Sequence, residues 1–219
     1  MNVEFDRHGA VAQAVAFAAY AQDGRVREGT ALPCIVHSME TAAIAATMTN
    51  DPDVLCAAVL HDVAEDCGVT EAELRSRFGR RVAQMVLYMS EPPRSDPRGS
   101  WQRCKLRTVN RLRVAGREQM ILALADRLSS LRAVDRARRE QGPMVWRRLG
   151  QANPSMHRWY YASVAEALKP IAHFEAYREY VALIDQVFED VRLPAPPEPD
   201  QFETGGISHA VYKDAGHRQ

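Results

Sequence analysis

The sequence predicts an all-α protein built from about eight to ten helices. From residue 5 to about residue 191, apolar residues recur at spacings of three and four rather than in alternation, which is the period of an amphipathic helix. The same stretch is rich in Ala, Leu, Met, Arg and Glu, which favour helices. Short polar segments that contain Gly or Pro interrupt this pattern and divide the chain into separate helices.

The composition limits the domain organisation and the classes of partner. A chain of 219 residues with 46% hydrophobic residues is long enough for one well-packed domain or two very small ones. Its 28 Lys and Arg balance its 28 Asp and Glu, so no long-range field attracts a polyanion. No segment approaches the roughly 20 apolar residues of a membrane-spanning helix, and the N-terminus lacks the order of a secretion signal. The four cysteines form no CxxC pair, which is typical of reduced thiols. We therefore expect a cytoplasmic protein that binds neither nucleic-acid polymers nor membranes.

The first two helices are expected on either side of a polar loop. The first runs from about Glu4 to Gln22, and five residues form its inner stripe: Val11, Ala14, Val15, Ala18 and Ala19. The segment 23–33, DGRVREGTALP, contains two glycines and a proline and is expected to be a loop. A second, alanine-rich helix is expected from about His37 to Thr49.

The third helix is expected to be central, because its sequence is almost wholly apolar up to His61 and Asp62. Asp51 and Pro52 are typical of the cap and the first turn that open a helix. The helix is then expected to continue through residues 54–66, VLCAAVLHDVAED.

A capping box opens the next helix, since Thr70 is followed three residues later by Glu73. This helix should end near Arg77, and Gly79 should separate it from a further helix over residues 80–90.

The C-terminal half begins with a proline-rich loop over residues 91–100. Helices are then expected over Trp101–Ala115, Glu118–Arg139, Val145–Leu149, His157–Leu168 and Tyr177–Val191. After Leu193 the composition changes to PAPPEPDQFETGG, whose prolines exclude a helix and whose few apolar residues can bury little surface. We therefore expect one helical domain over residues 1–193 and an extended or disordered tail over residues 194–219.

Residue types that bind metal ions lie at four positions of the expected helices: His37, His61, Asp62 and Asp126. A buried ionised aspartate is costly unless a cation or hydrogen bonds compensate it, so two aspartates and two histidines in a helical core predict a shared metal ion. Nitrogen and carboxylate ligands suit Mn²⁺, Fe²⁺, Zn²⁺ or Co²⁺, and without a cysteine they do not suit a closed structural zinc site. Any one of these residues alone would more often be an ordinary core or surface residue. The adjacent His61–Asp62 pair favours the metal site.

Two acidic residues follow this pair. Glu65 and Asp66 come four residues after His61 and Asp62, about one helical turn, so we expect them on the same face. Acidic groups beside a metal ion can take a proton from a reacting water. The alternative is an ordinary acidic helix end, although acids at a helix C-terminus oppose the helix dipole.

Four motifs in a fixed order resemble those of a known family. The chain reads RxGTxLPxIVH, AAVLHDVAED, FGxxVAxMV and LALADRLSSLR. This series resembles the HD-superfamily phosphohydrolases, in particular the small alarmone hydrolases related to the hydrolase half of RelA/SpoT proteins. The resemblance covers roughly residues 5–188 and includes the WYY segment at residues 159–161. The HD pair alone is a weak signal, whereas the ordered series is specific.

The resemblance implies an all-α HD domain with one divalent ion, most often Mn²⁺. The ion would be held by His37, His61, Asp62 and Asp126. It also implies that Glu65 and Asp66 position or activate the water that attacks phosphorus, which in alarmone hydrolases removes the 3′-pyrophosphate of ppGpp or pppGpp. The products would be GDP or GTP and pyrophosphate.

The resemblance further implies a set of substrate contacts. Arg25 and Arg27 lie in the loop where the family carries basic residues, and the forked donors of arginine suit phosphate groups. Solvated loop arginines are an equal alternative. Lys105 is a further candidate, as are Arg127 and Arg132, although Arg132 fits a surface or salt-bridge residue equally well.

The chain departs from the family near the presumed base and ribose pocket. Family members read ADKLxNxR or ADKLHNAR after the last metal-binding aspartate, and the Asn serves the nucleoside end of the substrate. This chain has Ser129 and Ser130 there, with Ser130 as the expected substrate contact, and it has Cys34 where Tyr is usual and Gln22 where His is common. Phosphate-ester cleavage is therefore better supported than ppGpp as the substrate.

Three functions stay open at this point. The chain is an alarmone hydrolase, or an enzyme of the same fold that acts on another phosphorylated nucleoside in a specialised biosynthetic pathway, or a non-catalytic nucleotide-binding module that keeps a metal ion for stability. Glu65 and Asp66 argue against the third, because a purely structural ion needs neither. A small nucleotide is the expected partner, and the sequence does not decide whether the chain forms a homo-oligomer.

Overall fold

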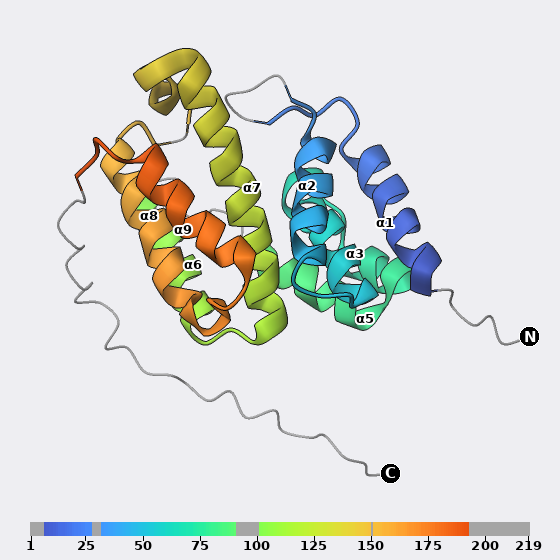
Figure 1. Cartoon of the computed structure of the whole chain (residues 1–219). Coiled ribbons are helices and arrows are strands. Elements are labelled where there is room, and N and C mark those ends of the chain that lie inside the picture. Colours follow the sequence, from blue (N-terminus) through green and yellow to red (C-terminus); the bar gives the residue numbers. More distant parts are fainter. Residues whose placement is uncertain (1–6, 28–31, 91–100, 150, 193–219) are drawn as a thin grey trace, which may run out of the picture.

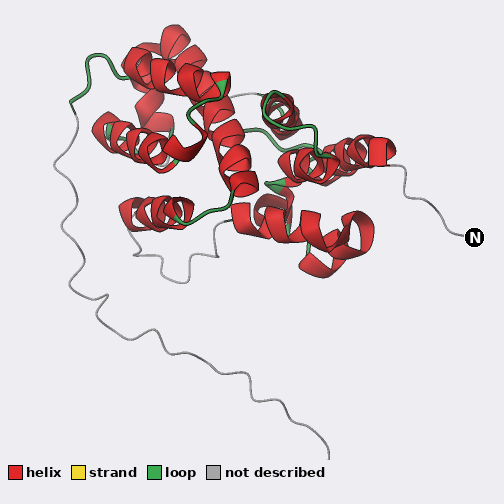
Figure 2. Cartoon of the chain, turned by 60° about the horizontal axis from the view of Figure 1, so that its bottom comes forward, coloured by secondary structure: helices red, strands yellow, loops and turns green. Residues whose placement is uncertain are grey.

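A computed structural model describes residues 7–27, 32–90, 101–149 and 151–192. Within these ranges it contains nine α-helices and two short 3₁₀ helices and no strand, which confirms the all-α prediction (Figure 2). The α-helices are α1 (Arg7–Ala21), α2 (Cys34–Ala46), α3 (Pro52–Leu60), α4 (Val63–Cys67), α5 (Glu71–Met89), α6 (Trp101–Arg113), α7 (Arg117–Gln141), α8 (Pro154–Ala167) and α9 (Glu175–Val187). The 3₁₀ helices are η1 (Gly142–Arg148) and η2 (Lys169–Ile171).

The long helix α7 lies between two groups of helices (Figure 1). One group comprises α1, α2, α3 and α5, and the other comprises α6, α8 and α9. Helix α7 packs against α2, α3 and α5 on one side and against α9 and η1 on the other. Its apolar run from Met120 to Ala125 is buried, as is the run from Cys56 to Leu60 in α3. The two most buried helices therefore meet at the centre of the molecule.

Local sequence signals predicted several helix ends correctly. The Asp51 side chain accepts a hydrogen bond from the Asp53 amide at 2.9 Å and caps α3, with Pro52 in the first turn. The Thr70 hydroxyl accepts from the Glu73 amide at 3.2 Å and opens α5. Gly79 interrupts α5 with φ +86°, a conformation that L side chains rarely adopt.

The predicted continuous helix over residues 54–66 is wrong. Helix α3 ends at Leu60 and α4 begins at Val63, so His61 and Asp62 lie in a turn between the two. In an unbroken helix the carbonyl of Ala58 accepts the amide of residue 62. Here that carbonyl lies 2.8 Å from Nδ1 of the His61 ring. The histidine side chain thus takes part in ending the helix that carries it.

Smaller differences concern other helix boundaries. Helix α2 begins at Cys34, three residues before the predicted start at His37. Residues 145–148, predicted as an α-helix with Leu149, lie in the 3₁₀ helix η1. On α1, Ala14 and Ala18 are buried as predicted, whereas Ala19 is exposed, because the apolar residues of this helix cover more than one face. The predicted loop 91–100, the tail 194–219 and the first residues of the N-terminal helix lie outside the described residues.

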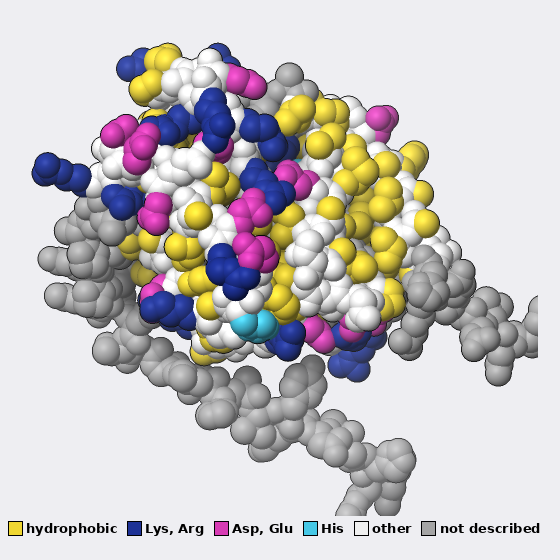
Figure 3. Space-filling view, in the orientation of Figure 1, with side chains coloured by type: hydrophobic (Ala, Val, Ile, Leu, Met, Phe, Trp, Pro, Cys, Tyr) yellow, Lys and Arg dark blue, Asp and Glu magenta, His cyan; other side chains and the backbone are white. Residues whose placement is uncertain are grey.

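The surface carries charges of both signs beside an apolar face. Over α7 and α9, basic and acidic side chains alternate, whereas apolar side chains gather over α1 and α2 (Figure 3). Large exposed apolar side chains on these two helices are Tyr20, Val36 and Met39. In the described part of the chain, no helix combines the length and the apolar character needed to cross a bilayer.

Candidate metal centre

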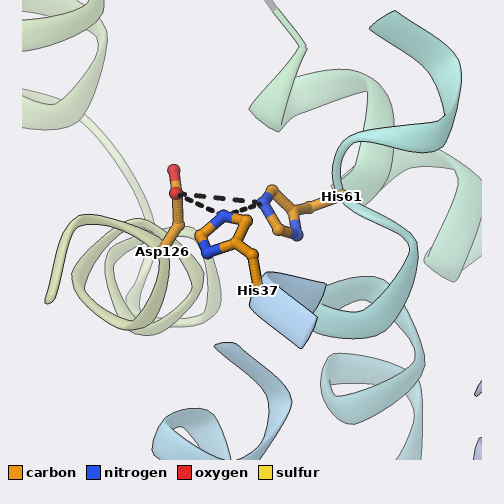
Figure 4. A group of neighbouring side chains, drawn as sticks. All are labelled: His37, His61 and Asp126. Atoms are coloured by element: carbon orange, nitrogen blue, oxygen red, sulfur yellow. Dashed lines mark hydrogen bonds and ion pairs between the residues drawn. The ribbon is translucent and has the colours of Figure 1, made fainter. Parts of the chain in front are cut away.

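The fold brings the four predicted metal ligands together at the meeting point of α2, α7 and the α3–α4 turn. His37 lies in the first turn of α2, His61 and Asp62 in the turn, and Asp126 in the buried middle of α7. In Figure 4 the two imidazole rings and the Asp126 carboxylate point toward one another. One donor atom each from His37, His61 and Asp126 lies within 4.8 Å of the others, and all three residues are buried.

The distances between the donor atoms are short. Nε2 of His37 lies 3.2 Å from Nε2 of His61 and 3.3 Å from Oδ1 of Asp126. Nε2 of His61 lies 3.8 Å from that same oxygen. Asp62 completes the group, with Oδ1 at 3.1 Å from Nε2 of His61 and Oδ2 at 3.8 Å from Nε2 of His37.

The outer nitrogens of both rings are held by groups outside this cluster. Nδ1 of His61 lies 2.8 Å from the Ala58 carbonyl, which can only accept, so Nδ1 carries the proton. Nδ1 of His37 lies 2.8 Å from the Ser129 hydroxyl. Both rings therefore turn Nε2 toward the centre of the cluster, where a neutral ring presents a lone pair when Nδ1 is protonated.

This donor set fits a divalent metal ion. Ligand atoms about 2.1 Å from a tetrahedral ion lie about 3.4 Å from one another. The measured separations of 3.1 to 3.8 Å between the nitrogens and carboxylate oxygens are close to that value. Two lone pairs that face each other beside two carboxylates need a positive charge between them, which a cation or a proton supplies.

The shifted pKa values of the residues in the cluster also indicate that it favours a positive charge. Burial acts to lower the pKa of His61, but the charges of Asp62 and Asp126 outweigh it and raise the pKa to about 9. Burial lowers the pKa of His37, although the contact with Asp126 opposes this. For Asp126, burial acts to raise the pKa, yet the Arg127 guanidinium, 3.0 Å away, and the two imidazoles hold it well below its usual range. The two rings thus face carboxylates that stay ionised.

The predicted acidic pair lies on α4 beside the centre. The side chains of Glu65 and Asp66 are exposed, and the Asp66 amide donates to the Asp62 carbonyl at 2.8 Å, which keeps the pair within one turn of the ligands. Partial burial and the charge of Asp62 raise the pKa of Asp66. The expectation that the pair continues a single helix is wrong, because α4 is a separate helix. That Glu65 faces the reaction stays a prediction.

Two of the predicted substrate contacts adjoin the centre directly. Arg27 donates from Nη2 to the Ser130 hydroxyl at 3.3 Å, and Ser130 donates to Oδ1 of Asp126 at 3.3 Å. Arg25 is exposed, and its charge counteracts the rise in the pKa of Asp66, so it lies within electrostatic reach of α4.

Lys105 lies farther from the ligands, on α6. Its Nζ is 5.9 Å from the Trp101 ring centre and 5.3 Å from that of Tyr160. The Arg127 guanidinium lies 5.5 Å from the same Tyr160 ring, so Tyr160 separates two cations, of which Arg127 contacts Asp126. That Lys105 contacts a substrate stays a prediction.

Other residues that the sequence singled out have structural roles. Arg132 forms ion pairs with Glu40 and Glu179. The Gln22 amide is buried and donates to Ser38. Ser129 is only 1% exposed, and its hydroxyl contacts His37 and Glu40, whereas Ser130 is partly exposed. That Ser130 contacts a substrate stays a prediction.

Glu40 adjoins the site through Ser129 but was not among the predicted site residues. Glu40 follows His37 by three residues on α2, a spacing that puts both side chains on one face of a helix. An acidic residue at this spacing from a suspected metal-binding histidine is a signal that could have pointed to it.

Comparison with known proteins gives consistent results. A sequence profile described as HD domain matches residues 14–151. A guanosine-3′,5′-bis(diphosphate) 3′-pyrophosphohydrolase of Vibrio cholerae is 31% identical over 166 residues, which cover 75% of this chain and 21% of that protein. The protein of the same description from Haemophilus influenzae is 30% identical over 185 residues, 84% of this chain and 24% of that protein. This chain thus spans about a quarter or less of the length of these relatives.

Two solved structures share the fold. A protein from Listeria monocytogenes EGD-e superimposes with a TM-score of 0.63 at 27% identity, covering 70% of this chain and 99% of that one. A metazoan ortholog of SpoT, reported to hydrolyse ppGpp, superimposes with a TM-score of 0.62 at 18% identity, covering 84% of this chain and 97% of that one. At that identity, the second likeness shows the fold alone.

Proposed function

Because this chain belongs to the HD domain family, we propose that it is a metal-dependent phosphohydrolase that cleaves a phosphate or pyrophosphate ester of a nucleotide. The first candidate substrate is (p)ppGpp, since the curated relatives are pyrophosphohydrolases of that nucleotide. The proposal depends most on one observation, the convergence of two buried imidazole Nε2 atoms with the buried Asp126 carboxylate and the partly exposed Asp62 carboxylate. We place the activity in the cytoplasm and in one HD domain over residues 1–193, with the tail 194–219 outside it.

His37, His61, Asp62 and Asp126 would hold the ion, for which we propose Mn²⁺, with Zn²⁺, Fe²⁺ and Co²⁺ as alternatives. A divalent cation there would act as a Lewis acid on a phosphoryl oxygen and lower the pKa of a nearby water. Asp66 is suited to accept a proton from the attacking water, because its raised pKa makes it a better base than an ordinary aspartate. Glu65 would orient that water or share the proton.

The basic residues around the centre would bind the phosphate groups. Arg27 already donates to Ser130 beside Asp126, so a phosphate near the centre would meet its guanidinium. Arg25 and Lys105 would add positive charge farther out, and Ser130 would contact the nucleoside end of the substrate.

The experiment that tests the proposal is a screen of phosphorylated nucleosides, ppGpp among them, with each of the four metals. Released phosphate and pyrophosphate are measured separately. We expect metal-dependent release from at least one nucleotide and none after chelation. If the protein binds a divalent metal and no nucleotide releases either product, the enzymatic proposal is wrong, and a non-catalytic nucleotide-binding module is the alternative that remains to be tested.

A second candidate substrate class is another phosphorylated nucleoside, and Ser130 is the observation that favours it. Its hydroxyl cannot present the paired donor and acceptor of an Asn side chain. We predict that hydrolysis of ppGpp is accompanied or exceeded by hydrolysis of another nucleoside phosphate, and that Ser130→Asn shifts the ratio of kcat/KM values toward ppGpp, on the order of 10-fold. Ser76→Asn, on the exposed side of α5, is the control. A natural protein that already prefers ppGpp by orders of magnitude would contradict this.

Metal binding should depend on pH, because protons compete for the same imidazole nitrogens. The pKa of His61 is raised from 6.5 to about 9, so below about pH 9 the metal-free protein holds a proton that the ion must displace. Metal affinity should therefore rise with pH and level off above about pH 9. The stabilisation of the metal-free protein by this charged imidazole is fully present below pH 6.5 and lost as the pH rises through about 9.

Calorimetric titration in two buffers of different ionisation enthalpy measures the protons released. We expect about one proton per ion at pH 7 and fewer above pH 9. Metal binding without proton release at pH 7 would contradict the prediction that the ion displaces a proton from His61.

A further inference from the structure

A series of hydrogen-bonded side chains runs from His37 to the surface of the molecule. The Ser129 hydroxyl lies 2.8 Å from Nδ1 of His37 and 2.8 Å from Oε2 of Glu40. The other Glu40 oxygen accepts from Nη1 of Arg132 at 3.2 Å. Arg132 also donates from Nε and Nη2 to the two oxygens of Glu179, at 2.7 and 2.8 Å. This series of hydrogen bonds thus links α2 and α7 to α9.

The direction of these hydrogen bonds follows from the chemistry of their members. An ionised carboxylate can only accept, so the single hydroxyl proton of Ser129 goes to Glu40. The contact between Ser129 and His37 must then be donated by the ring, from Nδ1–H to the hydroxyl oxygen. In the neutral ring this leaves Nε2 unprotonated, with its lone pair toward His61 and Asp126.

We propose that Ser129 and Glu40 are positioning residues that hold His37 in the Nδ1–H tautomer and thereby set the affinity of the centre for its metal ion. The inference rests on the proposed metal-dependent function. Arg132 supports the arrangement, because its ion pair with Oε1 of Glu40 at 3.2 Å holds the carboxylate that faces Ser129. Outer-shell partners of this kind fix the orientation and basicity of a ligating histidine.

The two histidines are fixed in different ways, which makes the proposal testable within one molecule. The Nδ1 of His61 donates to the backbone carbonyl of Ala58, which a substitution at Ser129 leaves in place. The tautomer of His37 depends on side chains alone. A change at Ser129 should therefore affect one ring and leave the other as an internal reference.

The experiment compares three variants with the natural protein. Ser129→Ala removes the acceptor, Ser129→Thr keeps a hydroxyl, and Glu40→Gln keeps an acceptor oxygen without the charge. Ser38→Ala is the matched control, since Ser38 is also fully buried on α2 and contacts Gln22 rather than His37. Thermal melts establish that each variant folds.

The first measurement is the tautomer of each ring, by long-range ¹H–¹⁵N NMR of the metal-free protein at a pH well above 9, where both rings are neutral. We expect His37 to carry its proton on Nδ1 in the natural protein, in Ser129→Thr and in Ser38→Ala. In Ser129→Ala the Nε2–H form of His37 should appear, while His61 stays unchanged.

The second measurement is the dissociation constant for Mn²⁺, by competition with a chelator. We expect it to rise about 10- to 100-fold in Ser129→Ala, to rise less in Glu40→Gln, and to change little in Ser129→Thr and Ser38→Ala. An unchanged His37 tautomer and an unchanged affinity in Ser129→Ala overturn the inference while the proposed function stands. If Ser129→Ala fails to fold, an unchanged tautomer and affinity in Glu40→Gln overturn it instead. A natural protein that binds no divalent metal overturns both, and this is seen before any variant is made.

Discussion

Replacing Asp126 by alanine is expected to abolish metal binding and all metal-dependent turnover. Oδ1 of Asp126 lies 3.3 Å and 3.8 Å from the two Nε2 atoms of the cluster, and its Oδ2 holds the Arg127 guanidinium at 3.0 Å. Its removal takes away one candidate ligand and also the negative charge that faces the Arg127 guanidinium, which repels a cation a few ångströms away. Both effects act in the same direction, so the loss should exceed that of a single ligand.

The control for this variant lies on the same helix. Asp135 is also buried on α7 and pairs with Arg139 at 2.8 Å and Gln186 at 3.2 Å, away from the cluster. Asp135→Ala should lower stability and keep the metal, whereas Asp126→Ala should lose it, as measured by elemental analysis of the purified proteins and by chelator competition. A folded Asp126→Ala protein with undiminished metal content would remove Asp126 from the ligand set.

The substitution Glu65→Gln is expected to lower kcat by roughly 10²-fold or more while the metal stays bound, which is the usual contribution of a positioned acid or base. Glu65 lies on α4, outside the group of convergent donor atoms, so its loss should not disturb the ligands. Asp66→Asn should also lower kcat while the metal stays bound, because Asp66 lies one turn from Asp62.

Glu71→Gln is the matched control for the acidic pair. Glu71 is an exposed glutamate at the start of the next helix, paired with Arg75 at 3.6 Å, and its change should leave kcat within about two-fold. Metal content is measured in each variant so that loss of turnover can be separated from loss of the ion. An unchanged kcat in Glu65→Gln would assign the proton transfer to Asp66 or to solvent.

The parts of the fold that the sequence predicted are those decided by neighbours along the chain. The cap at Asp51 and the break at Gly79 depend on residues within one turn, and both were found where they were expected. The end of α3 was missed for a different reason. His61 and Asp62 keep helical backbone angles. Neither is a residue type, such as Gly or Pro, that would mark the end of a helix in the sequence. The break coincides with a contact of the His61 ring, which residue type alone does not reveal.

The same distinction applies to the candidate site. The four candidate ligands were predicted from their types, because buried histidines and aspartates are unusual in apolar helices, and the fold places them together. The contacts of Ser129 with His37 and Glu40 were not predicted, since they depend on which side chains of another helix lie opposite. The ion pair of Arg127 with Asp126 was not predicted either. Ser129 was expected near the nucleoside, and only the packing of α2 on α7 shows that its hydroxyl faces His37.

The turn between α3 and α4 has a consequence for how the centre assembles. His61 and Asp62 are neighbours in the sequence, and the His61 nitrogen and the Asp62 oxygen lie 3.1 Å apart. Two of the four candidate ligands are therefore brought together at almost no cost in chain entropy, because no loop has to be closed between them. His37 and Asp126 join them only when α2 and α7 have packed. A metal ion held by all four residues would thus bind the folded chain far more tightly than the unfolded one and would stabilise the tertiary structure.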